Sequence, residues 1–420
     1  MGPTEAPRRV TVIGLGYVGL PLAVAAAEAG FLVTGLDTDE LRIKQLTAGD
    51  SYVEDITPER LLGALDSGLT VSHDYADATD FDVCVIAVPT PLRDGAPDLS
   101  YIESAASSVT PHLRPGATVV LESTSYPGTT EDVLRPILEH GSGLRAGRDF
   151  HLGYSPERID PGNTQWRLEN TPKVVSGVDE DSLGAIDSFY RRIVTRTVPV
   201  SSPRTAELTK LLENTFRQVN IALVNELAMC ARPLDVDIWE AVGAAATKPF
   251  GFMPFLPGPG VGGHCLPVDP TYLAWQVRRE LSHDVRFISL ANEINAHMPL
   301  HVVRRVAAGL GRELTGAHVL LLGLAYKKNT GDVRQSPAVE VARLLHEAGA
   351  HVRAVEPYAP PAHLPAHVLR VELTEEELRA ADAVVVTTDH DGFDYVLVER
   401  HARYVFDTRN RCRGEGVDRL

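Results

Sequence analysis

Hydrophobic and polar positions follow three successive patterns along the 420-residue chain. Through residue 200, short apolar runs suited to strands buried on both faces alternate with helical segments and glycine turns. These runs are "RVTVIG" (9–14), "FLVTGLD" (31–37), "FDVCVIAVP" (81–89), "GATVVLEST" (116–124) and "FHLGYSPER" (150–158). Strands that alternate with helices predict a doubly wound parallel sheet.

The pattern becomes helical from residue 201. The run "SSPRTAELTKLLENTFRQVNIALVNELAMCAR" starts with serine caps and a proline suited to the first helical position, and then has no breaker. One face of the predicted helix is apolar and contains Leu208, Leu212, Phe216, Val219 and Leu223. The other side carries Glu207, Lys210, Asn214 and Arg217, a plain solvated face by composition, and continues as Ile221, Val224 and Ala228. Apolar residues on both sides favour a central spine or a dimer helix.

Strand patterns return after residue 312, in "GAHVLLLGLAY", "AHVRAVEP", "ADAVVVTT" and "ARYVFDT". The sequence therefore predicts an α/β protein with two Rossmann-like, doubly wound parallel-sheet domains and a central helical domain with a long spine helix between them. The predicted domains are residues 1–200, 201–312 and 313–420.

Composition excludes several classes of protein. A formal net charge of -16 argues against nucleic-acid binding, although it permits a local basic pocket. Four separated cysteines without a CxxC pair suit a reducing cytosol and predict neither a disulfide framework nor a metal site. The start "MGPTEAPRRV" has no apolar core of a signal peptide, and no run is long enough to span a bilayer. We therefore expect a cytoplasmic protein without a membrane partner.

A dinucleotide motif follows the first predicted strand. "GLGYVG" fits G-x-G-x-x-G with Gly14, Gly16 and Gly19, and Asp37 ends the next strand. The glycines allow, in order, a tight turn, close approach to a pyrophosphate, and packing of the helix on the strand. Asp37 would accept hydrogen bonds from a ribose hydroxyl pair. Asp37 and Asp39 would repel a 2′-phosphate, and no arginine stands immediately beside them, which favours NAD over NADP. The alternative is a glycine turn that binds nothing.

The second strand-rich region carries "GLAYKKNTGDVRQSP" after its first strand instead. Lys327, Lys328 and Arg334 would stand at a strand's carboxyl end, where open α/β sheets bind ligands. This indicates a phosphate site without a dinucleotide signature, or else a solvated basic loop.

One cysteine differs from the rest. Cys265 lies in "GPGVGGHCLPVDP", whereas Cys84 falls in a buried strand and Cys230 and Cys412 read as inert. Glycines let backbone N–H groups converge on a developing oxyanion or a phosphate. With NAD, a nucleophilic cysteine would permit a four-electron oxidation of an alcohol to an acid through a thiohemiacetal and a thioester. The sequence assigns no role to the neighbouring His264.

These residues resemble the UDP-glucose/GDP-mannose dehydrogenase family over nearly the whole chain. "VIGLGYVGLPLA", "VPTP", "ESTSYPGTT", "YSPER", "ELTKLLENTFRQVNIALVNEL", "GPGVGGHCLPVDP" and "GLAYKKNTGDVRQSP" occur in the family's order. The resemblance implies an N-terminal NAD domain, a homodimer formed through the central helix, and a C-terminal domain that holds a UDP-sugar.

The resemblance also implies individual roles. Cys265 would be the nucleophile, Lys210 and Asn214 would hold the reacting oxygen, Asp269 would position the lysine or a water, and Thr124 and Glu157 would bind and activate the hydrolytic water. The implied cofactor contacts are Gly14, Gly16, Tyr17, Val18, Gly19, Asp37, Pro89, Thr90, Thr124 and Arg334. The implied substrate contacts are Glu157, Lys210, Asn214, Arg217, Gly262, Gly263, Lys327 and Arg409.

Two departures from the UDP-glucose enzymes bear on the substrate. Pro161 stands where those enzymes carry a second glutamate, and Arg217 where they carry an apolar residue. Together with "ATKPFGF", they most resemble the branch that oxidises UDP-N-acetylglucosamine at C6. We hypothesise that Arg217 binds the acetamido oxygen; a structural salt bridge is the alternative. UDP-N-acetylmannosamine and UDP-glucose are alternative substrates, and a two-electron dehydrogenase or a non-catalytic nucleotide-sugar binding protein is an alternative function.

Overall fold

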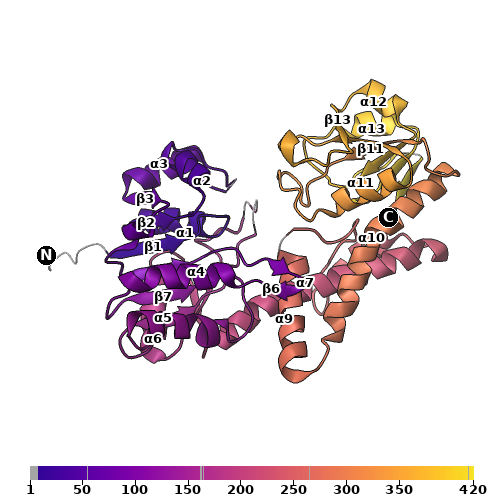
Figure 1. The fold of residues 1–420 in the computed structure, drawn as a ribbon. Helices are drawn as coiled ribbons and strands as arrows, with labels where there is room; N and C mark the ends of the chain where they lie inside the picture. Colours follow the sequence, from indigo (N-terminus) through magenta and orange to yellow (C-terminus); the bar gives the residue numbers. More distant parts are fainter. Residues whose placement is uncertain (1–7, 54, 161–162, 164, 264, 415) are drawn as a thin grey trace. The chain divides into compact units, whose positions relative to one another are not determined.

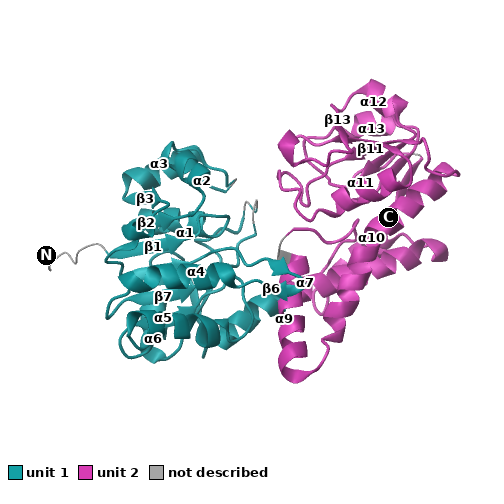
Figure 2. Ribbon diagram, in the orientation of Figure 1, with its two compact units in different colours: residues 1–213 teal, residues 214–420 magenta. Residues whose placement is uncertain are grey.

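The computed structural model describes residues 8–53, 55–160, 163, 165–263, 265–414 and 416–420, with Cys265 described by its backbone alone. The chain forms two compact units, residues 1–213 and 214–420 (Figure 2). Their boundary falls inside helix α7 (Pro203–Ala231). Residues 214–312, predicted as part of a separate helical domain, therefore belong to the same unit as the second sheet.

Unit 1 is built on one sheet with the strand order β10-β9-β8-β7-β4-β1-β2-β3 in the described chain. These strands are β1 (Arg9–Ile13), β2 (Leu32–Leu36), β3 (Leu69–Ser72), β4 (Val83–Ile86), β7 (Thr118–Leu121), β8 (His151–Tyr154), β9 (Lys173–Gly177) and β10 (Thr197–Pro199). The five predicted strands are β1, β2, β4, β7 and β8, and the predicted doubly wound sheet is confirmed. A small hairpin, β5 (Leu92–Arg93) with β6 (Ala96–Pro97), lies outside this sheet.

One pairing differs from the predicted parallel sheet. Strand β9 runs antiparallel to β8, and β10 is parallel to β9. A parallel connection needs a crossover, usually a helix. Residues 155–172 contain no helix among those described, so this connection does not impose a parallel partner.

Alternate strand residues face opposite sides of the sheet and build two cores. On one face, Val12, Val83 and Val85 pack with α1 (Gly19–Glu28), α3 (Pro58–Asp66) and α6 (Glu180–Tyr190). On the other, Ile13, Cys84 and Ile86 pack with α4 (Ser100–Val109), the π-helical turn η3 (Thr129–Leu134) and α5 (Arg135–Ser142). Helix α2 (Glu40–Thr47) and the short 3₁₀ turns η1 (Tyr75–Ala78) and η2 (Thr110–His112) complete the unit.

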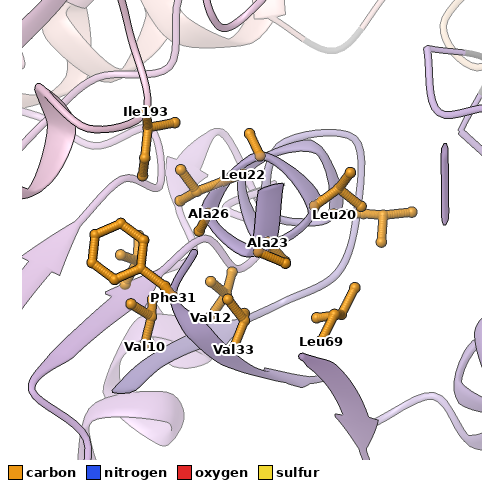
Figure 3. Packing of buried hydrophobic residues seen from close by; sticks show 14 of the residues in the cluster. Val10, Val12, Leu20, Leu22, Ala23, Ala26, Phe31, Val33, Leu69 and Ile193 are labelled. Carbon is orange, nitrogen blue, oxygen red and sulfur yellow. The ribbon is translucent and has the colours of Figure 1, made fainter. Parts of the chain in front are cut away.

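The alanines of α1 let that helix lie close to the sheet. Figure 3 shows Ala23 and Ala26 of α1 above the strand residues Val10, Val12 and Val33.

Unit 2 has a second sheet, of order β13-β12-β11-β14-β15-β16 in the described chain, with parallel pairings throughout. Its strands are β11 (His318–Leu322), β12 (His351–Val355), β13 (Leu369–Arg370), β14 (Ala383–Val386), β15 (Val405–Asp407) and β16 (Val417–Arg419). The four predicted strands are β11, β12, β14 and β15. The short edge strands β13 and β16 were not predicted.

Helices cover both faces of this sheet (Figure 1). One face holds α10 (Arg286–Leu310), α11 (Pro337–Glu347), α8 (Ile238–Ala246) and the C-terminal half of α7; the other holds α12 (Glu375–Ala380) and α13 (Tyr395–His401). The remaining elements are α9 (Cys265–Leu281), η4 (Arg232–Leu234) and η5 (Pro361–His363). No helix in the described part of the chain is long and apolar enough to cross a membrane.

Burial along α7 reverses the pattern expected from polarity. The apolar residues Leu208, Leu212, Phe216 and Leu223 are exposed, Leu212 by 63%. Glu207, Lys210 and Asn214 are buried, so their interpretation as a solvated face is wrong. Arg217 is exposed, as that interpretation expected. Because buried polar groups almost always have hydrogen-bond partners, we expect each of these three side chains to have a defined partner.

Candidate active site

The glycine turn after β1 has the geometry of a dinucleotide site. Gly14 has φ +90°, and a Cβ on it would lie 2.5 Å from the carbonyl oxygen of Ala87. A Cβ on Gly19 would lie 1.8 Å from the Gly14 oxygen, whereas one on Gly16 would meet no protein atom within 4 Å. The first and third glycines are thus required by the fold, and the second leaves the space in which a pyrophosphate would approach.

Asp37 follows β2 at the same edge of the sheet. Its carboxylate accepts hydrogen bonds from the backbone N–H groups of Leu15, at 2.9 Å, and Asp39, at 3.0 Å. Arg42 lies 3.3 Å from it, so the expectation that no arginine stands beside Asp37 is wrong. The guanidinium arrives from α2, five residues later, and is already paired with the two carboxylates Asp37 and Asp39.

The other predicted cofactor residues gather at the carboxyl ends of neighbouring strands. Strands β1 and β4 are adjacent where the strand order reverses, the position at which open α/β sheets bind ligands. Pro89 and Thr90 follow β4, the first exposed and the second buried. Thr124 follows β7 and is half-buried, as are Tyr17 and Val18 of the glycine turn. These residues fit an NAD molecule laid along this edge.

Glu157 and Lys210 are in contact in unit 1. The ammonium of Lys210 donates a hydrogen bond to the backbone oxygen of Glu157 at 2.5 Å, and both side chains are buried. The Glu157 carboxylate accepts from the N–H of Ile159. Burial raises the pKa of Glu157, and the charge of Lys210 opposes that rise. A carboxylate whose pKa is raised by burial is suited to general-base chemistry near neutral pH.

A second buried lysine supports this pair and was not predicted. Lys173 forms an ion pair with Glu122 and donates to the Pro156 oxygen at 3.1 Å; its ammonium lies 4.0 Å from the Glu157 carboxylate. Burial, and then the charge of Lys210, lower the pKa of Lys173 well below its usual value. Glu122 is 1% exposed and Lys173 2%, so each depends on the other as its ion-pair partner in an almost dry site.

We expect Lys173→Met to destabilise unit 1 by about 3 kcal/mol, because it leaves the Glu122 carboxylate buried without its ion-pair partner. The midpoint of urea-induced unfolding measures the effect. The double variant Glu122→Gln with Lys173→Met should recover part of the loss. Arg148→Gln, which breaks an exposed pair with Asp149, serves as the control and should leave the unfolding midpoint almost unchanged. A Lys173→Met change as small as that control would contradict the prediction.

Glu207 anchors the loop after β7 to α7. Its carboxylate accepts from the N–H groups of Gly128, at 2.6 Å, and Thr130, at 2.9 Å, and from the Thr130 hydroxyl. Burial raises the pKa of Glu207 to about 7 against the lowering effect of these bonds. One feature of the sequence could have indicated that Glu207 belongs to the site. It stands three residues before Lys210, and this spacing places both side chains on one side of a helix.

In unit 2, Asn214 and Asp269 form a buried pair. The Asn214 amide donates to the Asp269 carboxylate at 2.5 Å, and Asp269 is 1% exposed. Asp269 lies in the first turns of α9, which begins at Cys265. The fold thus ties the start of the cysteine helix to α7. The side chain of Cys265, and His264 and Pro161 entirely, lie outside the described residues.

The glycine loop before Cys265 is held by buried amides. Asn225 accepts from the N–H of Gly258 at 2.9 Å and donates to Asn295 at 3.0 Å. A Cβ atom on either Gly262 or Gly263 would lie 2.8 Å from the side chain of Tyr326, too close for a real contact. These two glycines therefore allow the loop to pack against the "GLAYKKNT" loop, a reason that the sequence did not reveal.

The basic residues predicted in the second sheet have different surroundings. The guanidinium of Arg409 donates to the Thr387 oxygen at 2.9 Å and approaches Gly258 at the start of the glycine loop. Lys327 is half-buried after β11. Arg334 is exposed and forms two hydrogen bonds with Asp332.

Cys84 and Cys412 are buried in the cores, and Cys230 is exposed. Among the described residues, no cluster of histidine, cysteine and acidic side chains is arranged to hold a metal.

Comparison with known proteins assigns all three regions of the chain to one family. The UDP-glucose/GDP-mannose dehydrogenase family matches through its NAD binding domain at residues 8–194, its central domain at residues 204–297 and its UDP binding domain at residues 320–414.

Individual relatives cover nearly the whole chain. The UDP-N-acetyl-D-mannosamine dehydrogenase of Pyrococcus horikoshii is 38% identical over 415 residues, which are 96% of this chain and 95% of that protein. The UDP-N-acetyl-D-glucosamine 6-dehydrogenase of Pseudomonas aeruginosa is 39% identical over 355 residues, 83% of each chain. The structure of a UDP-glucose dehydrogenase from Pyrobaculum islandicum superposes with a TM-score of 0.89 at 30% identity, over 100% of this chain and 98% of that one. The chain therefore belongs to the UDP-glucose/GDP-mannose dehydrogenase family of NAD-dependent oxidoreductases.

Proposed function

We propose that the protein oxidises the C6 hydroxyl of a UDP-N-acetylhexosamine, foremost UDP-N-acetylglucosamine, to the UDP-uronic acid with two molecules of NAD. The observation that carries this proposal is the burial of Lys210, whose ammonium is held against the backbone of Glu157. Burying an ammonium costs desolvation free energy unless a negative charge compensates it. The negative charge that develops on a reacting oxygen would provide such compensation. NAD, when bound, accepts one hydride in each of the two oxidation steps.

The residues of unit 1 would handle protons and charge. Lys210 would stabilise the C6 oxygen as alkoxide and then as oxyanion. Glu157, whose pKa is raised by burial, would take a proton from the water that cleaves the thioester. Thr124, which follows β7 as Glu157 follows β8, would position that water, since these strands are parallel neighbours. Lys173 and Glu122 would keep the Glu157 segment in place.

The residues of unit 2 would hold the sugar and supply the nucleophile. The Cys265 thiolate would add to the C6 aldehyde, the thiohemiacetal would lose a hydride to give a thioester, and water would release the acid and the thiol. Asn214, fixed by Asp269, would donate to the C6 oxygen. Lys327 would bind the diphosphate, and Arg409, Gly262 and Gly263 would contact the nucleotide sugar. Arg334 would contact the cofactor only if its guanidinium left the ion pair with Asp332.

The acetamido sugar is supported by two observations. Relatives named for N-acetylated sugars have 38% and 39% identity. Arg217 is exposed on α7, which leaves its guanidinium accessible from solvent. UDP-N-acetylmannosamine is the second candidate, because the relative named for it covers 96% of the chain.

A substrate panel tests the sugar and the role of Arg217 together. We expect the wild-type kcat/KM to be highest for UDP-N-acetylglucosamine among that sugar, its manno isomer and UDP-glucose. Loss of a charge-assisted hydrogen bond in Arg217→Leu should lower kcat/KM for UDP-N-acetylglucosamine about tenfold, with UDP-glucose changed less than about twofold. Arg217→Lys, which keeps a charge, is the control. Unchanged turnover of UDP-N-acetylglucosamine by Arg217→Leu would remove Arg217 from the site, and a preference for another sugar would replace the proposed substrate.

We also propose that the protein acts as a homodimer in the cytosol. The exposed apolar face of α7, formed by Leu208, Leu212, Phe216, Leu223 and Leu227, supports pairing with a second copy.

A further inference from the structure

A buried histidine joins the loops at the carboxyl edge of the second sheet. Strands β11 and β14 are adjacent there, and the chain leaves them toward opposite sides of the sheet, which makes their carboxyl ends the ligand-binding position of an open α/β fold. The loop after β11 carries Lys327, Lys328 and Asn329, and the loop after β14 carries His390 and Asp391. Contacts between the two loops therefore border the position of a ligand.

Both ring nitrogens of His390 have defined partners. Its Nδ1 accepts a hydrogen bond from the backbone N–H of Asn329 at 2.9 Å, and its Nε2 lies 3.2 Å from a Glu356 carboxylate oxygen. A backbone N–H can only donate, so Nδ1 is the acceptor, and Nε2 carries the ring proton and donates a hydrogen bond to the Glu356 carboxylate. His390 and Glu356 are 0% and 1% exposed, so water does not compete for these bonds.

Glu356 occupies the place in this sheet that Asp37 has in the first. It follows the second strand, and its carboxylate accepts from the N–H groups of Leu324 and Ala325 in the loop after β11. Two further bonds come from Tyr358 and Ala359. Burial would raise the pKa of Glu356, but the bonds from His390 and the backbone outweigh it and lower the pKa to about 2. The carboxylate is thus ionised, and backbone N–H groups of the neighbouring loops hold it in place.

The backbone of Asn329 lies in the left-handed region, with φ +59°, which asparagine adopts more readily than most residues with a side chain. Its side chain exchanges two hydrogen bonds with Asp391, at 2.7 and 2.9 Å, and Asp391 also lies 3.3 Å from Lys328. His390 holds the N–H at the same residue, so the loop that carries both lysines is fixed from β14.

We propose that His390 is a positioning residue for nucleotide binding, and that it acts through the backbone of Asn329 to hold the lysine loop in the conformation that binds the diphosphate of UDP. The inference rests on the proposed function for the UDP moiety and is independent of the sugar. If only a fraction of molecules holds the loop correctly, the apparent affinity for UDP falls by that fraction.

Two substitutions of similar size separate the two bonds of His390. An asparagine places its amide oxygen near the position of Nδ1 and can accept from Asn329, whereas a glutamine amide reaches the position of Nε2 and contacts Glu356. Calorimetric titration of the full-length protein with UDP should show about tenfold weaker binding for His390→Gln and less than about threefold for His390→Asn. Affinity for NAD and the thermal unfolding midpoint should be similar in the two variants.

The outcomes distinguish this inference from the function on which it rests. Wild-type UDP affinity retained by a folded His390→Gln variant would overturn the role of His390, and so would equal losses in both variants. A wild-type protein that does not bind UDP would overturn the proposed function itself. The inference is supported, whichever sugar is the substrate, if the wild type binds UDP and His390→Gln loses about tenfold in affinity while His390→Asn loses less than about threefold.

Discussion

Cys265→Ser is expected to lower the rate of uronic acid formation by a factor on the order of a thousand. A serine hydroxyl ionises far less readily than a thiol, so it would add poorly to the C6 aldehyde. The loss should fall on kcat, since the substitution leaves the groups proposed to bind UDP unchanged. NADH absorbance and chromatography of the sugar product measure it.

The exposed Cys230 provides a matched control. Cys230→Ser makes the same chemical change on the same chain and should leave the rate within about twofold, because surface substitutions usually have small effects. Acid production by Cys265→Ser at the rate of Cys230→Ser would contradict covalent catalysis by Cys265.

Lys210→Met should lower kcat by about a hundredfold to a thousandfold with a smaller change in KM. The side chain is 7% exposed, and its ammonium is fixed by the Glu157 backbone, so its charge is preorganised and poorly screened. Removal of one preorganised donor from an oxyanion costs rates of this size. Methionine keeps the length and apolar stem of lysine, which limits disturbance of α7. Initial rates over a range of nucleotide-sugar concentrations separate kcat from KM.

Lys210→Arg tests whether charge alone suffices. It keeps the cation but changes the donor geometry, so we expect activity between wild type and Lys210→Met. A Lys210→Met variant that unfolds like wild type and retains more than a tenth of its kcat would remove Lys210 from the chemistry.

Features encoded by local sequence were predictable. Gly14, Gly16 and Gly19 stand between a strand and a helix, and Asp37 ends the next strand, so one short segment specifies the turn, the helix and the acid. The strands that follow are buried on both faces and stand out as continuous apolar runs. The direction of β9 was not predictable in this way, because it depends on whether the connection from β8 forms a crossover.

The burial of α7 was mispredicted because polarity alone does not reveal partners. Glu207 is buried because the N–H groups of Gly128 and Thr130 satisfy it, and these residues lie more than 75 positions away in the sequence. The ion pair of Lys173 with Glu122 is similarly long-range. Glu356 follows the second strand of its sheet as Asp37 does, but no glycine motif precedes it, so local sequence alone does not single it out.

The central claim is a four-electron oxidation, and the amount of NADH formed per sugar consumed tests it most directly. With limiting UDP-N-acetylglucosamine and excess NAD, the reaction run to completion should yield two NADH for each uronic acid. One NADH per sugar, with an aldehyde as the product, would contradict the claim and indicate a two-electron dehydrogenase.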